Sequence, residues 1–410
     1  MASLDFTPVH EDDEVYSITG KALKLTTAEN IKPYIDDLLK LKKVTKIDFS
    51  GNTIGIEASK SLADAISHHS SIYENVIEVN FADLYTSRLV DEVVESLKYL
   101  LSTSGGLLKC SKLEILNLSD NALGLRTIDI LEKFIANAIQ LKHLILSNNG
   151  MGPFAGERIG KALYTLAQNK KKQNKPMLET FICGRNRLEN GSAVYLALGL
   201  KSHGDGLRCV KLYQNGIRPR GIATLLKYGL KYNSKLEILD LQDNTFTSTA
   251  SLILAETLPV WKHSLRELNV NDCLLKTPGC DAVLKVFSQV EFVNLAKLKL
   301  QYNEMAHETL VNELIPALKN KKLPSLNLLE LNGNRLLEDS DDLDELANVF
   351  GGEIDDLDDL EELDSEDEDE EDADEDNEEE LEDIDTNELE KALDENEISK
   401  LTEALEDVHI

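Results

Sequence analysis

The sequence contains no run of about 18 apolar residues, and this absence argues against a membrane-spanning helix. Its first residues, MASLDFTPVHEDDE, lack the basic and apolar segments of a secretory signal. The five cysteines are widely spaced, and no two of them form a CxxC pair. We therefore expect reduced thiols in a cytosolic or nuclear protein, and neither disulfides nor a metal site.

Enzyme signatures are also missing. There is no GxSxG, no HExxH and no phosphate-binding loop, and the nearest match, GERIGKA at 156–162, has too short a gap and Ala162 where Ser or Thr is required. The eight histidines are scattered, and the adjacent pair His68 and His69 falls at the end of an expected helix. We predict no cofactor of the chain's own and no metal, and a dedicated enzyme is the weakest functional interpretation.

Positive charge is absent from one long segment. The 410 residues carry a net charge of −32, yet residues 353–390 hold 26 Asp and Glu and no Lys or Arg. Such a segment cannot pack a core, so we predict a disordered acidic tail over 353–390. The tail would repel phosphates, which argues against nucleic-acid binding; it suits a basic protein partner or simple solubility.

After the tail, residues 391–410 are predicted to contain a short helix. Asn387 followed by Glu390 has the spacing of a capping box at the start of such a helix. The helix would place four leucines near one side, namely Leu389, Leu393, Leu401 and Leu405. The sequence does not indicate whether this helix docks anywhere.

What the chain does have is a repeat. The pattern L-x-x-L-x-L-x-x-N recurs through residues 1–352, with steps of 28 to 37 residues. Leu84 and Cys273 replace the asparagine in two copies. We call the asparagine slots the Asn positions: Asn52, Asn121, Asn149, Asn186, Asn215, Asn244, Asn303 and Asn334.

One repeat predicts one strand and one helix. In LEILNLSDN, Leu116 and Leu118 alternate with polar residues, as in a strand that is buried on one side. In GIATLLKYGL, apolar residues recur at helical spacing. Because a single unit cannot bury its own apolar face, the units must stack. We predict a domain over 1–352: an α/β leucine-rich-repeat horseshoe like that of ribonuclease inhibitor, with parallel strands on the concave face, helices on the convex face, and atypical end repeats at 15–41 and 326–350.

The residue just before each Asn position varies and is expected at an exposed rim. We call these residues the rim positions: Gly51, Asp83, Asp120, Asn148, Arg185, Gln214, Asp243, Asp272, Tyr302 and Gly333. We assume that the scaffold does not dictate their side chains, so that polar variety here serves recognition. A plain solvated rim is the simpler alternative. Two functions remain: a protein-binding scaffold or inhibitor, and a regulator that places side chains in a partner's active site.

Several short sequence segments resemble those of a known protein family. LYTSRLVDEV, LSNNGMGP, CGRNRLENGS, QNGIRP, LDLQDNTFT, LNVNDCLL, LQYNE and LELNGNR occur in order and are followed by the acidic tail. Together they closely resemble the Ran GTPase-activating protein family, and CGRNRLENG and the arginine of the irregular repeat are the most specific. The chain resembles the short members, which end after the tail and lack the C-terminal domain that anchors animal members at nuclear pores.

The resemblance implies stimulation of GTP hydrolysis by Ran in the cytoplasm, which gives nucleocytoplasmic transport its direction. The family is understood to work without an arginine finger and to order the GTPase's own catalytic glutamine. The partner would be Ran in its GTP form, which carries the GTP and magnesium, and a Ran-binding protein can complete a ternary complex. We expect the chain itself to be a monomer.

The resemblance also assigns the functional residues of the family to positions in this sequence. The family's arginine matches Arg88, and its asparagine matches Asn148, which would position the partner's glutamine. Arg88 would either brace the partner's switch region, which we prefer, or add charge near the phosphates; a drifted N-terminal repeat is the alternative. Arg88 and Asn148 are therefore the candidate catalytic residues, and the candidate partner-binding residues are Asp83, Arg185, Arg187, Gln214, Asp243 and Asp272.

Overall fold

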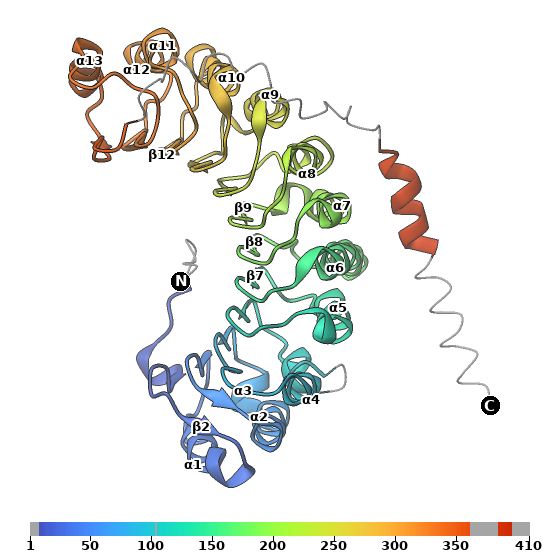
Figure 1. The fold of residues 1–410 in the computed structure, drawn as a ribbon. Helices are drawn as coiled ribbons and strands as arrows, with labels where there is room; N and C mark the ends of the chain where they lie inside the picture. Colours follow the sequence, from blue (N-terminus) through green and yellow to red (C-terminus); the bar gives the residue numbers. More distant parts are fainter. Residues whose placement is uncertain (1–7, 103–104, 361–383, 396–410) are drawn as a thin grey trace.

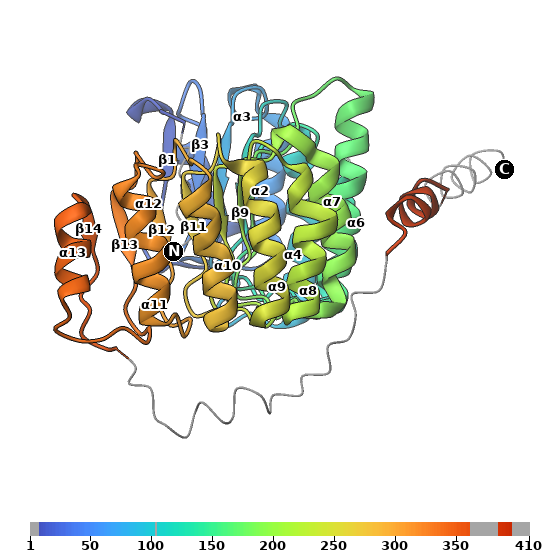
Figure 2. The ribbon, with the colours of Figure 1, turned by 90° about the horizontal axis from the view of Figure 1, so that it is seen from above.

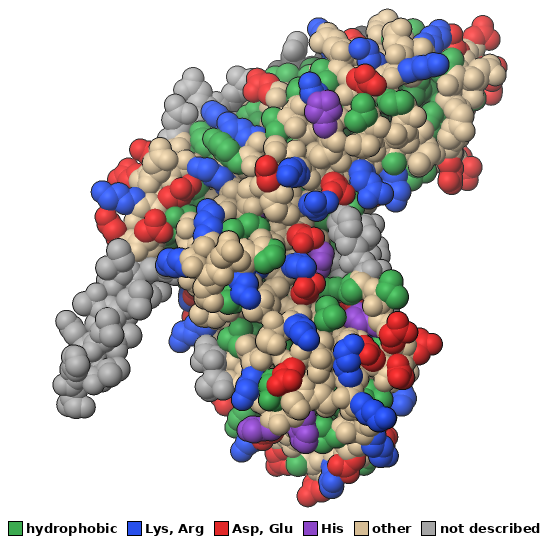
Figure 3. All heavy atoms as spheres, turned by 180° about the vertical axis from the view of Figure 1, so that it is seen from behind, with side chains coloured by type: hydrophobic (Ala, Val, Ile, Leu, Met, Phe, Trp, Pro, Cys, Tyr) green, Lys and Arg blue, Asp and Glu red, His purple; other side chains and the backbone are tan. Residues whose placement is uncertain are grey.

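The computed structural model describes residues 8–102, 105–360 and 384–395. It confirms the predicted solenoid: the repeats curve into a horseshoe with strands on the inside and helices on the outside (Figure 1), and the helices stand side by side around the convex surface (Figure 2). Positive and negative side chains are interspersed over the face in Figure 3.

The concave face is a parallel sheet of 12 strands, in the order β1-β3-β5-β6-β7-β8-β9-β10-β11-β12-β13-β14. A second sheet of two strands, β2 and β4, lies beside the first repeats. The strands are β1 (Val15–Ser17), β2 (Lys24–Leu25), β3 (Lys46–Asp48), β4 (Thr53–Ile54), β5 (Glu78–Asn80), β6 (Ile115–Asn117), β7 (His143–Ile145), β8 (Thr180–Ile182), β9 (Cys209–Lys211), β10 (Ile238–Asp240), β11 (Glu267–Asn269), β12 (Lys297–Lys299), β13 (Leu328–Glu330) and β14 (Glu353–Ile354).

The convex face is formed by helices of very different lengths. The α-helices are α1 (Ala28–Leu38), α2 (Ile56–His68), α3 (Ser70–Tyr73), α4 (Val90–Leu100), α5 (Ile128–Asn137), α6 (Gly152–Lys172), α7 (Ala193–His203), α8 (Pro219–Thr224), α9 (Thr247–Thr257), α10 (Lys276–Gln289), α11 (His307–Thr309), α12 (Ile315–Lys319) and α13 (Asp341–Val349). Two single-turn π-helices, η6 (Leu225–Gly229) and η9 (Leu310–Leu314), continue α8 and α11. No helix within the described ranges is both long and apolar enough to cross a membrane.

The core lies between the sheet and the helices. The middle residue of each three-residue strand from β3 to β13 points into it and is fully buried, as Leu116 and Leu144 are, and these residues pair across neighbouring strands in register. All five cysteines are buried free thiols, as expected for small core residues. The alternating pattern of the repeat therefore encodes the inward face of the sheet.

The end of the repeat domain differs from the prediction. Residues 353–360, which the composition assigns to the acidic tail, belong to the C-terminal cap. Glu353 and Ile354 form β14 against β13, and Asp355 accepts hydrogen bonds from the backbone N–H groups of Leu331 and Asn332, at 2.7 and 2.9 Å. A carboxylate is well suited to the exposed backbone N–H groups at the end of a sheet. Residues 361–383 lie outside the described residues.

A buried lysine anchors the longest helix. The side chain of Lys170, near the end of α6, donates hydrogen bonds to the carbonyl oxygens of Ile139, Leu141 and Pro176, at 2.9, 2.6 and 2.8 Å. Burial lowers its pKa to about 8. These contacts tie the basic insertion around residues 169–176 to the preceding repeat.

His203, at the end of α7, makes stability depend on pH. Its Nδ1 accepts a hydrogen bond from the N–H of Leu178 at 3.2 Å, and burial, with repulsion from Lys170, lowers its pKa from 6.5 to about 3. Between those values the unfolded chain binds the proton and the folded chain does not, so stability falls as the pH falls from 6.5 toward 3.

We expect this histidine to remove about 2 kcal/mol of stability between pH 7.5 and pH 5. The variant His203→Asn keeps an acceptor for Leu178 but cannot take up the proton. It should be less stable than the original at neutral pH because of the lost volume, and it should lose less on acidification. Urea unfolding at the two pH values measures this difference, and equal losses in the two proteins would contradict it.

Candidate functional site

The rim positions share one backbone conformation. All ten have positive φ, between 52° and 71°. This left-handed region is open to glycine and, at lower cost, to Asn and Asp. Seven of the ten rim residues are Gly, Asn or Asp. The assumption that the scaffold does not dictate rim side chains is therefore wrong, because the turn selects for small polar residues by itself.

Three rim residues depart from that preference: Arg185, Gln214 and Tyr302. For residues with larger side chains such as these, the left-handed backbone conformation is unfavourable by about 1 kcal/mol. Tyr302 has a structural reason, since its ring covers Gly333 and its hydroxyl donates a hydrogen bond to Asp359 at 3.0 Å. Arg185 is exposed, and Gln214 is exposed and donates a hydrogen bond to the neighbouring rim residue Asp243. These two positions are the ones that the backbone does not explain.

The Asn positions form a ladder beneath the rim. The side-chain oxygen of Asn186 accepts from the backbone N–H of Asn149 at 2.8 Å, and that of Asn215 accepts from the N–H of Asn186 at 2.8 Å. The side-chain amide of Asn186 also donates to the carbonyls of Leu146 and Cys183. The ladder thus satisfies buried backbone groups of adjacent turns, as the repeat predicts.

Asn148 and Asn149 have different surroundings. Asn149 is 1% exposed and belongs to the ladder, whereas Asn148 is exposed on the rim. The side-chain amide of Asn148 donates to a carboxylate oxygen of Asp120 at 2.7 Å. That bond uses the amide nitrogen, so the side-chain carbonyl oxygen of this exposed residue is left available as an acceptor. The predicted separation of a structural asparagine, Asn149, from an exposed rim asparagine, Asn148, is confirmed.

The irregular repeat places Arg88 against the two preceding repeats, in a position that we call the seat of Arg88. Leu84 is buried at the Asn position, and its own N–H still donates to Asn121 Oδ1 at 2.7 Å. Leucine offers no acceptor to the N–H of Asn52, so the ladder is interrupted here and resumes at Asn52, whose Oδ1 accepts from the N–H of Leu23 at 2.9 Å. The chain then bends through Ser87, with φ of 65°, and the N–H of Arg88 bonds back to the carbonyl of Tyr85 at 3.0 Å.

The Arg88 side chain reaches the small β2–β4 sheet. Its Nε donates to Thr53 Oγ1 at 2.8 Å, and its Nη2 donates to Thr26 Oγ1 at 3.1 Å and to the Thr53 carbonyl at 3.3 Å. A Cβ on Gly55 would lie 3.3 Å from Nη1 and 2.7 Å from the Thr26 carbonyl, so the seat requires glycine. All of these acceptors are neutral, so the guanidinium is oriented while its charge stays available.

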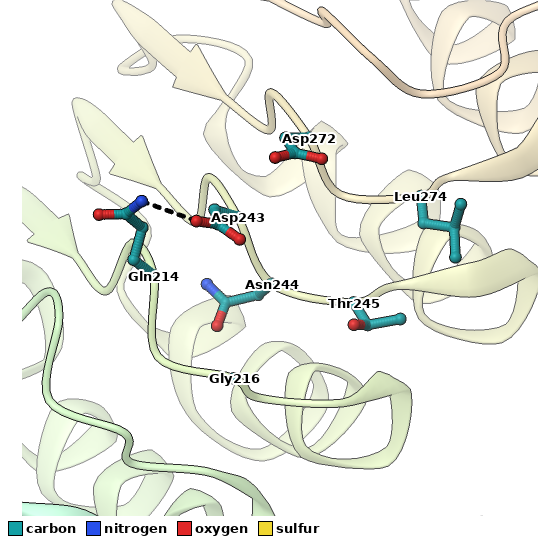
Figure 4. Close-up of a pocket in the computed structure, with 7 residues that line it drawn as sticks. All are labelled: Gln214, Gly216, Asp243, Asn244, Thr245, Asp272 and Leu274. Atoms are coloured by element: carbon teal, nitrogen blue, oxygen red, sulfur yellow. Dashed lines mark hydrogen bonds between the residues drawn. The ribbon is translucent and has the colours of Figure 1, made fainter.

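Three other candidates line one groove on the rim. A groove of about 420 Å³ is bordered by Gln214, Asp243 and Asp272 together with Gly216, Asn244, Thr245 and Leu274 (Figure 4). The amide nitrogen of Gln214 donates to Asp243 at 2.7 Å. Partial burial, and then the charge of Asp243, raise the pKa of Asp272. Two carboxylates, in a groove whose described lining holds no Lys or Arg, favour a positively charged group.

The remaining candidates are dispersed. Arg185 and Arg187 are both exposed in the turn after β8, and Arg187 also has positive φ, 54°. Asp83 faces its own loop and accepts a hydrogen bond from Thr86. The structure therefore gathers Gln214, Asp243 and Asp272 into one groove and leaves the others as separate points along the same edge.

Sequence reasoning missed three supporting residues. Asp120, which orients Asn148, was present among the rim positions, and its place one repeat before Asn148 was the available signal. Thr26 and Thr53 hold Arg88, but they come from earlier repeats, and only the pairing of β2 with β4 brings them together. No sequence signal identified those two threonines.

A family model and a solved structure match parts of this chain. Residues 109–126 and 232–249 match the family described as Leucine Rich repeat. Among solved structures, the leucine-rich repeat-containing protein LegL7 from Legionella pneumophila aligns with 18% identity and a TM-score of 0.34, over 75% of this chain and 81% of that one.

Curated relatives share one name. Ran GTPase-activating protein 1 of Saccharomyces cerevisiae is 67% identical over 350 residues, which make up 85% of each chain. Ran GTPase-activating protein 2 of Caenorhabditis elegans is 38% identical over 50% of this chain and 21% of its own length, and the Drosophila melanogaster relative is 32% identical over 54% and 36%. On the extent of the first match, this chain belongs to the Ran GTPase-activating protein family.

Proposed function

We propose that this chain stimulates GTP hydrolysis by the Ran GTPase without an arginine finger. It acts by ordering the partner's catalytic glutamine, and the GTP and magnesium are carried by the partner. The name shared by the relatives supports Ran as the partner. The observation that carries the mechanism is the seat of Arg88, whose side chain is held by its own chain through three hydrogen bonds.

An arginine finger must extend into the nucleotide pocket of the partner, where it stabilises charge in the transition state. Leaving its seat would cost Arg88 those three bonds and the closely packed environment around Gly55. We therefore assign Arg88 to bracing the partner's switch region while it remains in place. Leu89 and Val90, which are 74% and 52% exposed beside it, supply apolar contact area for the same region.

Asn148 is assigned to the glutamine itself. Its amide nitrogen is fixed by Asp120, so its carbonyl oxygen is oriented before the partner arrives. An oriented acceptor can hold the side-chain amide of a glutamine in the position where that glutamine aligns the attacking water. Catalysis by orientation of this kind requires no titratable group on the activator.

The groove between Gln214 and Asp272 is assigned to partner binding. Its carboxylates would contact lysine or arginine side chains of Ran, and Arg185 and Arg187 would contact acidic ones. Exposed pairs of this kind contribute little affinity each, but they set orientation and association rate. We further propose a cytoplasmic monomer that supports directional nucleocytoplasmic transport and that a Ran-binding protein can join in a ternary complex.

The alternative is a leucine-rich-repeat scaffold or inhibitor that binds without stimulating hydrolysis. A pull-down with Ran loaded with GTP or with GDP distinguishes the two functions. An activator that recognises the ordered switch region should retain Ran-GTP much more strongly than Ran-GDP. Equal retention of both forms, with no change in the hydrolysis rate, would leave the scaffold as the function.

A further inference from the structure

A cluster of lysines and tyrosines lies on the convex face, away from the rim. The ammonium groups of Lys161, Lys201 and Lys231 lie over tyrosine rings, at 4.3 Å from the centroid of Tyr195 and at 4.9 and 5.2 Å from that of Tyr232. Tyr164 and Tyr228 complete this convex cluster, which spans α6, α7, η6 and the short 3-10 helix η7 (Leu230–Tyr232). Cationic groups held over aromatic rings present both charge and apolar surface to an acidic ligand.

The described part of the C-terminal segment contacts this cluster. Residues 386–395 are helical, and Figure 1 shows this helix on the outer side of the solenoid. Lys201 bonds to Glu390 at 2.8 Å and to the hydroxyl of Thr386 at 3.4 Å. The hydroxyl of Tyr164 donates to Asp394 at 3.1 Å, and the backbone N–H of Ile384 donates to the hydroxyl of Tyr228 at 3.4 Å.

The partly buried residues of this helix lie on one face. Thr386, Leu389, Glu390 and Leu393 are partly buried, at the i, i+3, i+4, i+7 spacing of one helical face, whereas the residues between them are exposed. The side chains of Lys201 and Glu390 are only 22% and 29% exposed, so this pair is less screened than a surface pair. Burial, and then the Asp394 carboxylate, raise the pKa of the Tyr164 hydroxyl.

We propose that the convex cluster is a docking site for an acidic amphipathic helix, and that its occupant is residues 384–395 of the same chain. A ten-residue helix is only marginally stable alone in water, so its helicity depends on docking. The contacts are few, but the covalent link supplies a high effective concentration. Asp355 and Asp359 bond to the C-terminal cap, and Ile384 bonds to Tyr228 in the convex cluster.

Hydrogen exchange of the full-length chain, followed by mass spectrometry, tests this proposal. Amides of residues 387–395 should exchange at least about tenfold more slowly than in a free peptide of residues 380–410. The change Lys201→Glu should abolish that protection, and combining it with Glu390→Lys should restore much of it. Raising the salt concentration about tenfold should weaken the protection in the original chain.

Lys133→Glu, at an exposed position on the neighbouring helix α5, is the matched control and should leave the protection unchanged. Unaltered exchange of the β8 and β9 amides will show that each variant is folded. Protection equal to that of the free peptide, or unaffected by Lys201→Glu, would overturn the proposal. None of these outcomes depends on whether the chain stimulates a GTPase.

Discussion

Stimulation of GTP hydrolysis by Ran should fall about 100-fold or more when Arg88 is replaced by alanine. The guanidinium is held by Thr26 and Thr53 at a fixed place beside two exposed apolar residues, Leu89 and Val90. Without it, the switch region loses its brace, and the catalytic glutamine samples unproductive positions. The measurement is single-turnover hydrolysis at saturating activator, because saturation separates a defect in stimulation from a defect in binding.

Two further variants identify the cause of that loss. Thr53→Val removes the acceptor for Nε while preserving shape, so it should give a partial loss if orientation of Arg88 matters. Arg126→Ala, in the next repeat, removes an exposed arginine that forms an ion pair with Asp91, and it should change the rate less than about twofold. Full activity of the folded Arg88→Ala variant would refute the assignment of Arg88 even if the chain is an activator.

The largest loss of stability should come from Asn215, in the middle of the ladder. Its side-chain amide donates to the carbonyls of Cys183 and Leu212 at 3.0 and 2.8 Å, and its oxygen accepts from the N–H of Asn186 at 2.8 Å. Leucine has a similar size but leaves the buried N–H of Asn186 without its acceptor. It also removes one of the two side-chain amides that donate to each carbonyl, so that Cys183 keeps only the amide of Asn186 and Leu212 only that of Asn244. We expect Asn215→Leu to lower the free energy of unfolding by about 3–6 kcal/mol.

Another repeat of this chain has a natural replacement at the same position. Cys273 fills the same position in another repeat, where its thiol donates to the Leu241 carbonyl at 3.3 Å. Asn215→Cys should therefore cost less than Asn215→Leu. Asn137→Leu, at an exposed position on α5, should stay within about 0.5 kcal/mol of the original. The measurement is urea unfolding followed by circular dichroism; similar losses for Asn215→Leu and Asn137→Leu would contradict the role of the ladder.

The repeat framework could be predicted from the sequence because each local pattern agrees with the stacked fold. Leu116 and its equivalents point inward, and Asn149 could be separated from Asn148 by its register alone. The backbone conformation of the rim could not be read so directly. Because the rim residue differs from repeat to repeat, the sequence suggests that any side chain is tolerated there. The positive φ of the rim positions instead favours Gly, Asn or Asp at most of them.

Long-range contacts account for what the sequence did not reveal. The seat of Arg88 depends on Thr26, which is 62 residues away in the chain. Asp355 was assigned to a tail by its composition, yet it closes the end of the sheet by accepting from backbone N–H groups. Composition describes the average chemistry of a segment and does not detect one carboxylate with a specific structural contact.

The central claim is that a rigid rim orders the partner's own glutamine. Single-turnover hydrolysis should be compared at saturating activator for GTP-loaded Ran and for Ran whose catalytic glutamine is replaced by leucine. We predict an acceleration of about 10³-fold or more for unmodified Ran and almost none for the variant. No acceleration of unmodified Ran, or undiminished acceleration of the glutamine variant, would contradict it.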